Sequence, residues 1–264
     1  MLDGKRSLVI VLLLAALTGL AGCATKKAAP AAPADFADDL GPVVADPIEP
    51  WNRFWFAFND SLYIGVVKPV SKVYTTIVPK YGRDRIENAY SNFLFPVRFV
   101  NAVLQLRPDM ASRELGRFLV NSTFGIGGLY DLAASKPDMG PQKLDFGQTL
   151  GVWGFGHGFY LVLPVVGPSS LRDGIGIAGD VAVQPTTYLQ TPIVLTLAIS
   201  GAGRMNRFPE MIDIYEELKR SSIEPYTAAR DAYVQLRAKI IEDARRSNPV
   251  FGGQRTPAAA ATAP

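Results

Sequence analysis

The chain has 264 residues, of which 48% are hydrophobic and 19% are charged, and its formal net charge at pH 7 is +3. Such a small net charge argues against a nucleic-acid-binding protein, which would carry a strong basic patch, so we expect no nucleic-acid partner. With one histidine and one cysteine, the sequence also lacks the clustered ligands of a metal site. We therefore expect neither a metal nor a cofactor.

The first 22 residues have the pattern of a bacterial secretion signal. Lys5 and Arg6 precede an apolar run from Leu8 to Leu20, which is shorter than the roughly 20 residues that a membrane-spanning helix needs. The run ends in Leu20-Ala21-Gly22-Cys23, which matches the lipobox of bacterial lipoproteins. Cys23 is the only cysteine and has no disulfide partner within the chain, so we predict that its thiol carries lipid.

Composition divides the chain into four parts. Residues 1–22 form the signal peptide, and residues 23–45 form a lipidated, flexible tether rich in Ala and Pro. Residues 46–247 have the size of one helical domain, and residues 248–264 form an Ala/Pro-rich tail that we expect to be disordered. The residue after Cys23 is Ala24 rather than Asp, and by resemblance to the sorting rule of Gram-negative lipoproteins this favours the outer membrane. We therefore expect a lipid-anchored protein on the periplasmic side of that membrane.

The domain opens with a predicted helix start. Asp46 is placed to cap the helix, and Pro47 is placed at its first position. An aromatic stripe then follows at helical spacing, formed by Trp51, Phe54, Trp55 and Phe58. Two interpretations of the stripe stay open: it packs in the core, or it lies in the membrane interface, where Trp and Phe favour the headgroup boundary.

Four further helices are predicted along the chain. Asp84 and Glu87 have capping-box spacing before a helix that runs to Leu106, and Pro96 should kink it. Asp109 caps a third helix that runs to about Phe124. The last two helices span Pro209 to Arg220 and Pro225 to Arg246.

The final predicted helix is amphipathic. Its apolar face consists of Tyr226, Ala229, Tyr233, Leu236 and Ile240. Its opposite face carries charged residues that we expect to meet water or a soluble partner, namely Arg230, Asp231, Arg237, Lys239, Glu242 and Asp243.

The middle of the chain, from Gly147 to Gly179, is broken by glycines and by two prolines. Short broken helices and a pair of strands both fit this pattern. The segment Gly174 to Gly179 matches the dinucleotide-binding string, but no strand precedes it and no acidic residue follows about 20 positions later. Close packing of helices explains these glycines better.

The sequence offers no catalytic constellation. His157 is the only histidine, and Ser169 and Ser170 do not lie in a nucleophile elbow. We therefore expect no catalytic residues and no enzymatic activity. The body has many apolar segments and none long enough to cross a bilayer, so it forms either a soluble core or a disc half-sunk in lipid.

Four segments together resemble the MlaA (VacJ) family of lipoproteins. They are Asp46 to Asn59, Arg117 to Asp131, Asp145 to Gly154 and Leu163 to Asp173. The resemblance implies a mainly α fold, with a ring of interfacial amphipathic helices, Gly/Pro-rich loops and little β structure. It also implies removal of mislocalised phospholipids from the outer leaflet, which maintains lipid asymmetry.

The partners implied by this resemblance are phospholipid, the outer membrane, a trimeric porin, and a soluble periplasmic carrier of an ATP-driven inner-membrane system. The candidate channel region comprises Gly147, Gly151, Gly154, Gly156, Gly158, Leu163, Pro164, Arg172 and Asp173. These segments could equally be turns of a scaffold. A structural lipoprotein that supports porins or the envelope without transport stays open as the alternative function.

Overall fold

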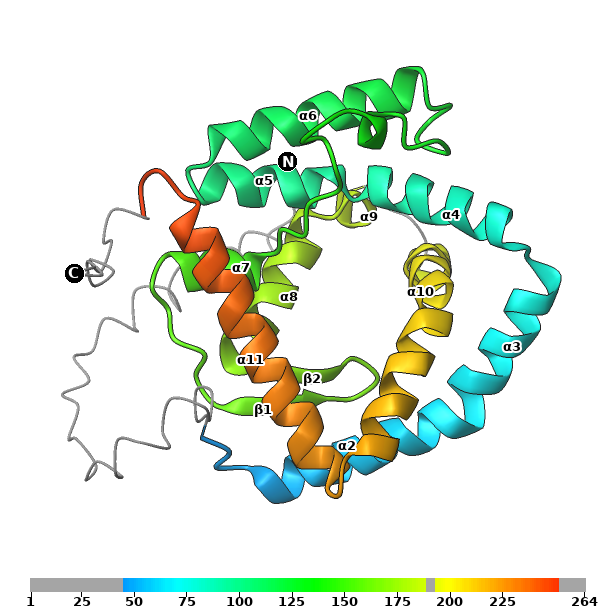
Figure 1. Cartoon of the computed structure of the whole chain (residues 1–264), viewed down its shortest axis with the longest axis vertical. Coiled ribbons are helices and arrows are strands. Elements are labelled where there is room, and N and C mark those ends of the chain that lie inside the picture. The colour runs from blue at the N-terminus through cyan, green and yellow to red at the C-terminus, as the bar shows by residue number, and fades with distance from the viewer. Residues whose placement is uncertain (1–44, 189–192, 252–264) are drawn as a thin grey trace, which may run out of the picture. The chain divides into compact units, whose positions relative to one another are not determined.

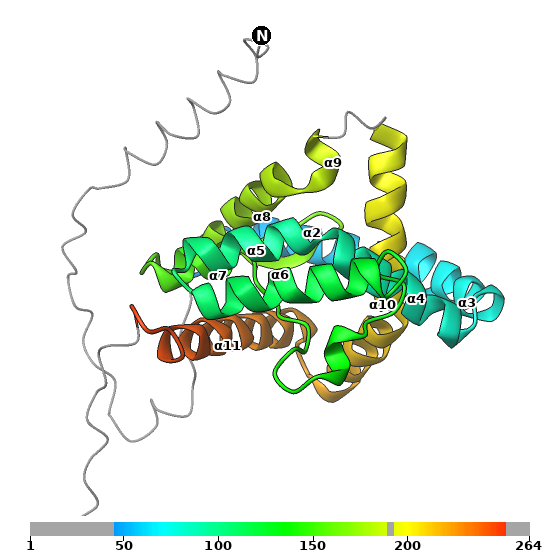
Figure 2. The same cartoon turned by 90° about the horizontal axis from the view of Figure 1, so that it is seen from above.

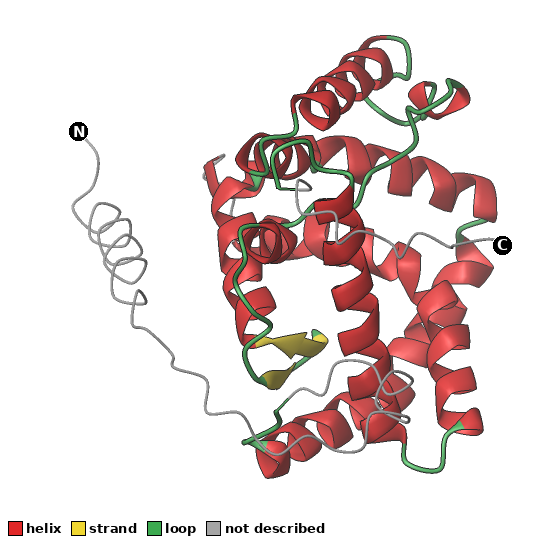
Figure 3. Cartoon of the chain, turned by 60° about the vertical axis from the view of Figure 1, so that its left-hand side comes forward, coloured by secondary structure: helices red, strands yellow, loops and turns green. Residues whose placement is uncertain are grey.

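The computed structural model describes residues 45–188 and 193–251, which belong to one compact unit, residues 42–264. Helices dominate the described residues, and their only sheet is a two-stranded hairpin (Figure 3). The expectation of a mainly α fold with little β structure is therefore confirmed. The signal peptide, Cys23, nearly all of the tether and the tail beyond residue 251 lie outside the described residues.

The first half of the unit is entirely helical. Its elements are α2 (Glu49–Leu62), the π-helical turn η1 (Tyr63–Val67), α3 (Lys68–Ile77), α4 (Lys80–Phe93), α5 (Phe95–Leu104) and α6 (Pro108–Thr123). The second half contains η2 (Ala133–Ser135), α7 (Phe146–Val152), β1 (Tyr160–Leu163), β2 (Gly167–Ser170), α8 (Leu171–Val183), α9 (Pro185–Tyr188), α10 (Ile193–Ser221) and α11 (Pro225–Arg246).

Within this unit the elements are arranged in a ring (Figure 1). The helices α2 to α5 follow one another along the rim, and α10 packs beside α3 and α4. The helices α7 and α8 pack together on the opposite side, and α11 crosses over α7 and the hairpin. Figure 2 shows α6 alongside α5, and α9 and the start of α10 rising on the same side of the ring. No helix among the described residues is long and apolar enough to cross a membrane.

The first helix begins later than the sequence predicts. Its N-cap position is Ile48, and Asp46 makes no capping hydrogen bond. The carboxylate of Asp46 instead accepts hydrogen bonds from the side-chain amide of Asn52, at 2.7 Å, and from the hydroxyl of Tyr226. The prediction of Asp46 as a cap is therefore wrong, because tertiary contacts occupy its carboxylate.

The predicted helix over residues 84–106 is two helices, α4 and α5, separated at Leu94. Pro96 lies in the first turn of α5, where its missing backbone donor has no cost. It therefore marks the start of a second helix rather than a kink. Asp84 lies inside α4 and pairs with Lys80, so the predicted capping box is also wrong.

Other helix boundaries differ in a similar way. Arg107, not Asp109, occupies the N-cap position of α6, and Asp109 lies in the first turn. The helix predicted over residues 209–220 is the second part of α10, which contains Pro209 in its interior. The sequence pattern did not predict α3. The bounds of α11, by contrast, are confirmed at both ends.

The apolar face of α11 is shifted from the predicted one. Tyr226 and Ala229 are buried as expected, but Leu236 is 58% exposed. Further along the helix, the buried residues are Val234, Ile241 and Ala244. The folded body also continues beyond residue 247, since Asn248 is buried and its side-chain amide donates to the carbonyl of Gln105 at 2.7 Å.

Two asparagines of α2 hold the hairpin in place. The fully buried Asn52 donates to the carbonyl of Tyr160 at 3.0 Å and accepts from the backbone of Val162 at 2.8 Å. Seven residues later, Asn59 donates to the carbonyl of Leu163 at 2.9 Å and accepts from the backbone of Val165 at 2.7 Å. Since seven residues make two helical turns, both amides face the free edge of β1.

A small aromatic core lies beneath this contact. Tyr160 and Val162 of β1 and Tyr226 of α11 form a buried cluster. Trp55 and Phe56 of α2 pack against it, together with Tyr233. The core therefore joins the start, the middle and the end of the domain.

We predict that Asn52→Ala lowers the unfolding free energy by about 2–4 kcal/mol, because it leaves a buried carbonyl and a buried N–H of β1 without partners. For a domain of this size the midpoint of thermal unfolding should fall by about 5–10 °C. Thermal unfolding followed by tryptophan fluorescence in detergent measures this.

The matched control is Ser61→Ala. This residue lies on the same helix, is exposed, and hydrogen-bonds only to the carbonyl of Ala57. We expect a change within about 0.5 kcal/mol for this variant. An equal loss in both variants would show that the Asn52 amide has no special role.

Candidate functional site

A cluster of charges joins α11 to the glycine-rich middle of the chain, with Arg237 and Asp173 largely buried and Asp145 partly exposed. Arg237 of α11 donates to both oxygens of Asp145, at 2.8 and 2.9 Å. The same guanidinium donates to both oxygens of Asp173, at 2.9 and 3.0 Å. Its side chain is only 13% exposed. The prediction that Arg237 lies on a water-facing surface is therefore wrong, because the residue forms an interior ion-pair cluster.

Asp173 receives two more donors in this cluster. Arg172 donates to it at 2.9 and 3.2 Å, and the hydroxyl of Tyr233 donates to it as well. Burial opposes the carboxylate charge, but the hydrogen bonds from Arg172, Arg237 and Tyr233 outweigh burial and hold the pKa of Asp173 well below its ordinary value. The carboxylate therefore stays ionised at all physiological pH values.

Asp145 and Asp173 both lie at helix N-termini, Asp145 as the cap of α7 and Asp173 in the first turn of α8. Asp145 caps α7 by accepting from the backbone of Gln148 at 2.7 Å. Ser170 caps α8 by accepting from the backbone of Asp173 at 3.1 Å. Negative charge at a helix N-terminus is favourable because it meets the positive end of the helix dipole. Arg237 thus ties two capped helix starts to α11.

Glycines let these three helices approach closely. A Cβ atom on Gly151 would lie 2.6 Å from the side chain of Ile241, and one on Gly176 would collide with the backbone of Gly147. A Cβ on Gly179 would strike the ring of Phe146. The string from Gly174 to Gly179 therefore lies within α8 and serves its packing against α7. This agrees with the helix-packing explanation that the sequence favoured.

The candidate channel residues fall into three places. Gly147 and Asp173 are buried in the ion-pair cluster. Leu163 and Pro164 lie at the end of β1 and in the hairpin turn. Gly151, Gly154, Gly156 and Arg172 line a common cavity, and Gly158 follows with a positive φ of 74°. The structure shows close contacts within the chain for several of them, and a role in lining a channel stays a prediction.

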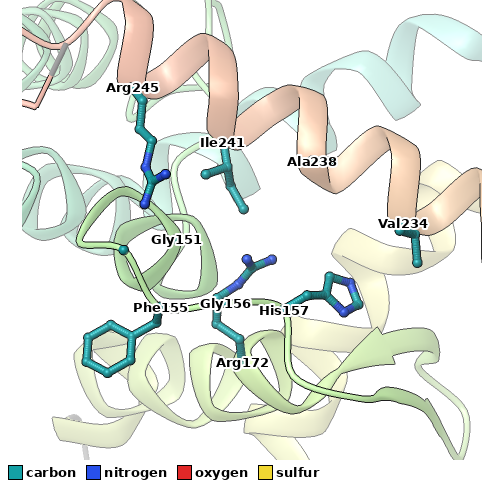
Figure 4. Close-up of a pocket in the computed structure, with 10 residues that line it drawn as sticks. Gly151, Phe155, Gly156, His157, Arg172, Val234, Ala238, Ile241 and Arg245 are labelled. Atoms are coloured by element: carbon teal, nitrogen blue, oxygen red, sulfur yellow. The ribbon is translucent and has the colours of Figure 1, made fainter. Parts of the chain in front are cut away.

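The cavity has a volume of about 250 Å³ and is shown in Figure 4. His157 lies on its edge, and neither ring nitrogen has a hydrogen-bond partner among the described residues. Burial lowers the pKa of His157, and the charge of Arg172 lowers it further. The ring packs edge-on against Tyr233 with centroids 5.9 Å apart.

The aromatic stripe of α2 divides between surface and interior. Trp51 and Phe54 are 54% and 62% exposed, and Phe58 is 43% exposed. Trp55 packs against the aromatic core and makes edge contacts with each of the other three rings, with centroids 5.3–5.7 Å apart. Contact of the exposed rings with lipid stays a prediction.

Sequence reasoning missed the structural roles of Asn52, Asn59 and Arg237. Asn52 and Asn59 interrupt an aromatic helix at a spacing of two turns, and this is a readable signal for a polar partner on one face. The sequence around Arg237 does not indicate an ion pair, because its partners Asp145 and Asp173 lie 92 and 64 positions away. Among the described residues, no group of three or more His, Cys, Asp or Glu side chains is arranged to hold a metal ion.

Comparison with known proteins gives a consistent result. The family model described as MlaA lipoprotein matches residues 44–240. The chain is 32% identical over 197 residues to the proteins of Shigella flexneri and Escherichia coli (strain K12) that are named intermembrane phospholipid transport system lipoprotein MlaA. Each alignment covers 72% of this chain and 76% of the relative. An uncharacterized protein of Rickettsia bellii is 32% identical over 200 residues, which cover 75% of this chain and 78% of that protein.

A solved structure is also similar to this fold. It comes from work described as "Structural basis for maintenance of bacterial outer membrane lipid asymmetry". The two chains superpose with a TM-score of 0.66 at 32% sequence identity. The match covers 75% of this chain and 99% of that one. The similarity therefore extends over the fold as well as the sequence.

We predict a pH-dependent stability that originates at Asp180. Burial raises the pKa of its carboxyl to about 6, although Asn101 and the backbone of Phe146 donate hydrogen bonds to it. The folded protein therefore binds this proton more tightly than the unfolded chain does. The stability that protonated Asp180 contributes is fully present below about pH 4, and it is lost as the pH rises through about 6.

Asp180→Asn keeps an oxygen for both donors and removes the titration. We expect this variant to be more stable than the parent by about 1–3 kcal/mol at pH 8 and nearly equal to it at pH 4. Chemical unfolding at both pH values measures the difference, with the exposed Asp231→Asn as the control. The same difference at both pH values would contradict the assignment.

Proposed function

Because the chain belongs to the MlaA lipoprotein family, we propose that it is the outer-membrane lipoprotein of an intermembrane phospholipid transport system. In this role it removes mislocalised phospholipids from the outer leaflet and so maintains lipid asymmetry. It passes them to a soluble periplasmic carrier of an ATP-driven inner-membrane system. The observation that carries the proposal is the match over residues 44–240, which spans most of the folded body.

The surface of the fold supports this role. Large apolar side chains are exposed on many helices, although no described helix could cross a membrane. On α2, α3 and α8 they include Trp51, Phe54, Phe58, Val70, Val73, Ile77, Ile175 and Val181. Exposed apolar area of this extent marks an interaction surface, and lipid in the membrane interface would cover it. The helices would then lie in one leaflet, beside a trimeric porin.

Attachment at Cys23 would hold the chain to this membrane from the periplasmic side. One acyl chain gives only marginal membrane binding, whereas two or more anchor a protein stably. The exposed aromatic rings of α2 would add a second hold through the body itself. Anchor and body would thus contribute separately to membrane attachment.

Transfer of a phospholipid between membranes breaks no covalent bond, so we propose that the protein is not an enzyme. The ring nitrogens of His157 contact no hydroxyl or carboxylate among the described residues, as a nucleophile–base pair would require. The relatives of known function are named as transport lipoproteins.

We propose that lipid passes within the ring of helices, next to the hairpin. Figure 1 shows the turn between β1 and β2 projecting across the ring toward α10. Val165 at this turn is 67% exposed and adopts a left-handed φ of 67°. Asn59 holds this turn through the backbone of Val165, so the hairpin has a defined position.

We predict that deletion of the protein places phospholipid in the outer leaflet and raises detergent sensitivity.

A cysteine at the hairpin turn tests the passage of lipid within the ring. In the deletion strain, Val165→Cys should restore lipid asymmetry, and attachment of a bulky maleimide to the new thiol should abolish that restoration. Acylation blocks the thiol of Cys23, so the new thiol is the only one that reacts.

The control is Leu236→Cys, which is similarly exposed but lies on α11. Its labelling should leave outer-leaflet phospholipid unchanged. A porin or envelope scaffold without transport would tolerate the label at both positions. Intact asymmetry in the deletion strain would contradict the transport function itself.

We also predict that Cys23→Ala impairs sorting to the outer membrane more than it impairs affinity for lipid, because the body keeps its exposed aromatic rings. Cell fractionation measures sorting, and co-flotation of the unacylated protein with phospholipid vesicles measures affinity. An unacylated protein that stays fully soluble without detergent, and does not float with vesicles, would contradict membrane contact by the body.

A further inference from the structure

The cavity between α11 and the loop after α7 has the chemistry of an anion site. Its lining residues are Gly151, Gly154, Phe155, Gly156, His157, Arg172, Val234, Ala238, Ile241 and Arg245. Two of them are arginines, one is a histidine, and none is acidic. Figure 4 shows Arg245 and Arg172 reaching toward the cavity from opposite sides.

Arg245 carries the uncompensated charge of this cavity. Among the described residues, no carboxylate lies within ion-pair distance of its guanidinium, and its Nε donates only to the carbonyl of Val152, at 3.4 Å. The next residue, Arg246, behaves differently, because it pairs with Glu242 on the surface. A half-buried guanidinium with spare donors is suited to bidentate contact with a phosphate.

One further donor faces the same space, and the ring of His157 lies beside it. Arg172 uses Nε and Nη2 to bind Asp173, which leaves Nη1 for a bound group. His157 also lines the cavity, and both of its ring nitrogens are buried without a hydrogen-bond partner among the described residues. Within the adjoining cluster, the charges of Arg172 and Arg237 balance those of Asp145 and Asp173. The net positive charge therefore comes from Arg245.

The remaining walls limit the size and character of the ligand. Val234, Ala238 and Ile241 form an apolar side, and nothing lies within 4 Å of a Cβ built on Gly156, so its backbone is open. A volume of about 250 Å³ is below the ~300–1,000 Å³ of sites that enclose a whole drug-sized molecule. The cavity therefore suits a small phosphorylated group with a short apolar stem, and not a complete two-tailed lipid.

We propose that this cavity binds a phosphate-centred anion, with Arg245 as its main charge partner and Arg172 as an additional donor, next to the ring of His157. The ligand that fits the proposed transport function is the headgroup of an anionic phospholipid, whose glycerol would lie along Val234, Ala238 and Ile241. This lipid source rests on the proposed function. The binding of a phosphate group does not.

The single histidine makes the test direct. The full mature chain, purified in a non-ionic, phosphate-free detergent on a histidine-free tag, is labelled with ¹⁵N-histidine. The imidazole signal of His157 is then followed during titration with short-chain phosphatidylglycerol, short-chain phosphatidylcholine, or inorganic phosphate. We expect a saturable shift with phosphatidylglycerol, and Arg245→Gln should weaken binding about tenfold by removing a charge-assisted contact.

Arg246→Gln is the matched control, since it removes the same charge one residue away on the surface. It should bind like the parent.

Ala238→Trp, which fills the cavity from α11, should abolish the shift of the His157 signal. The midpoint of thermal unfolding of this variant reports whether its fold is intact. Saturation by inorganic phosphate at the same concentration as by the lipid would support an anion site for free phosphate rather than headgroups.

No shift with any of the three probes, or equal weakening in Arg245→Gln and Arg246→Gln, would overturn the proposal. The outcome is separable from that of the transport function. A strain that carries Arg245→Gln reports on the site, whereas the deletion strain reports on transport. Loss of asymmetry on deletion with no binding in the cavity would remove the site and leave the function.

Discussion

The fold depends on one guanidinium that is shared between two carboxylates. Arg237 binds Asp145 at the start of α7 and Asp173 at the start of α8, so three helices meet at a single charged group. A buried ion pair contributes little net stability when its desolvation is included, but loss of one partner is costly, on the order of 3–5 kcal/mol, because a charge is left unpaired. The cluster therefore specifies one arrangement of α7, α8 and α11 and penalises others.

The surrounding packing follows from this constraint. With α11 drawn onto two helix starts, a side chain at Gly151 or Gly176 would have no room, and glycine at these positions permits the contact. The loop after α7 does not pack directly against α11. The cavity lined by Arg245 and His157 lies between this loop and α11. Charge, glycine content and cavity are thus consequences of one geometry.

The sequence predicted the parts of the fold that depend on local information. The bounds of α11 follow from Pro225 and a regular apolar period, and both ends agree with the structure. The role of Arg237 could not be predicted, because helical periodicity does not distinguish a charge that meets water from one that meets carboxylates far along the chain. Asp46 failed as a cap for the same reason, since Asn52 and Tyr226 compete for it.

The site shows the same division. The sequence named Arg172, Gly151, Gly154 and Gly156 as candidate channel residues, and these four line one cavity. Their role in a channel stays a prediction. The cavity's strongest charge, Arg245, was outside every motif and was not singled out by the sequence. An arginine without a carboxylate neighbour is a candidate to bind an anion. Whether a carboxylate lies nearby is decided by the fold and cannot be read from the order of residues in the sequence.

The contacts that close the domain join residues very far apart in the chain. Asp46 meets Tyr226 across 180 positions, and Arg53 meets Glu224 across 171. Such pairs cannot form until the C-terminal helix has been synthesised, so the contacts that close the domain are the last to become available. For a chain whose first residues predict export, this delay is useful. We expect such a chain to stay open while it is threaded through a membrane, and to close only when its last helix is available.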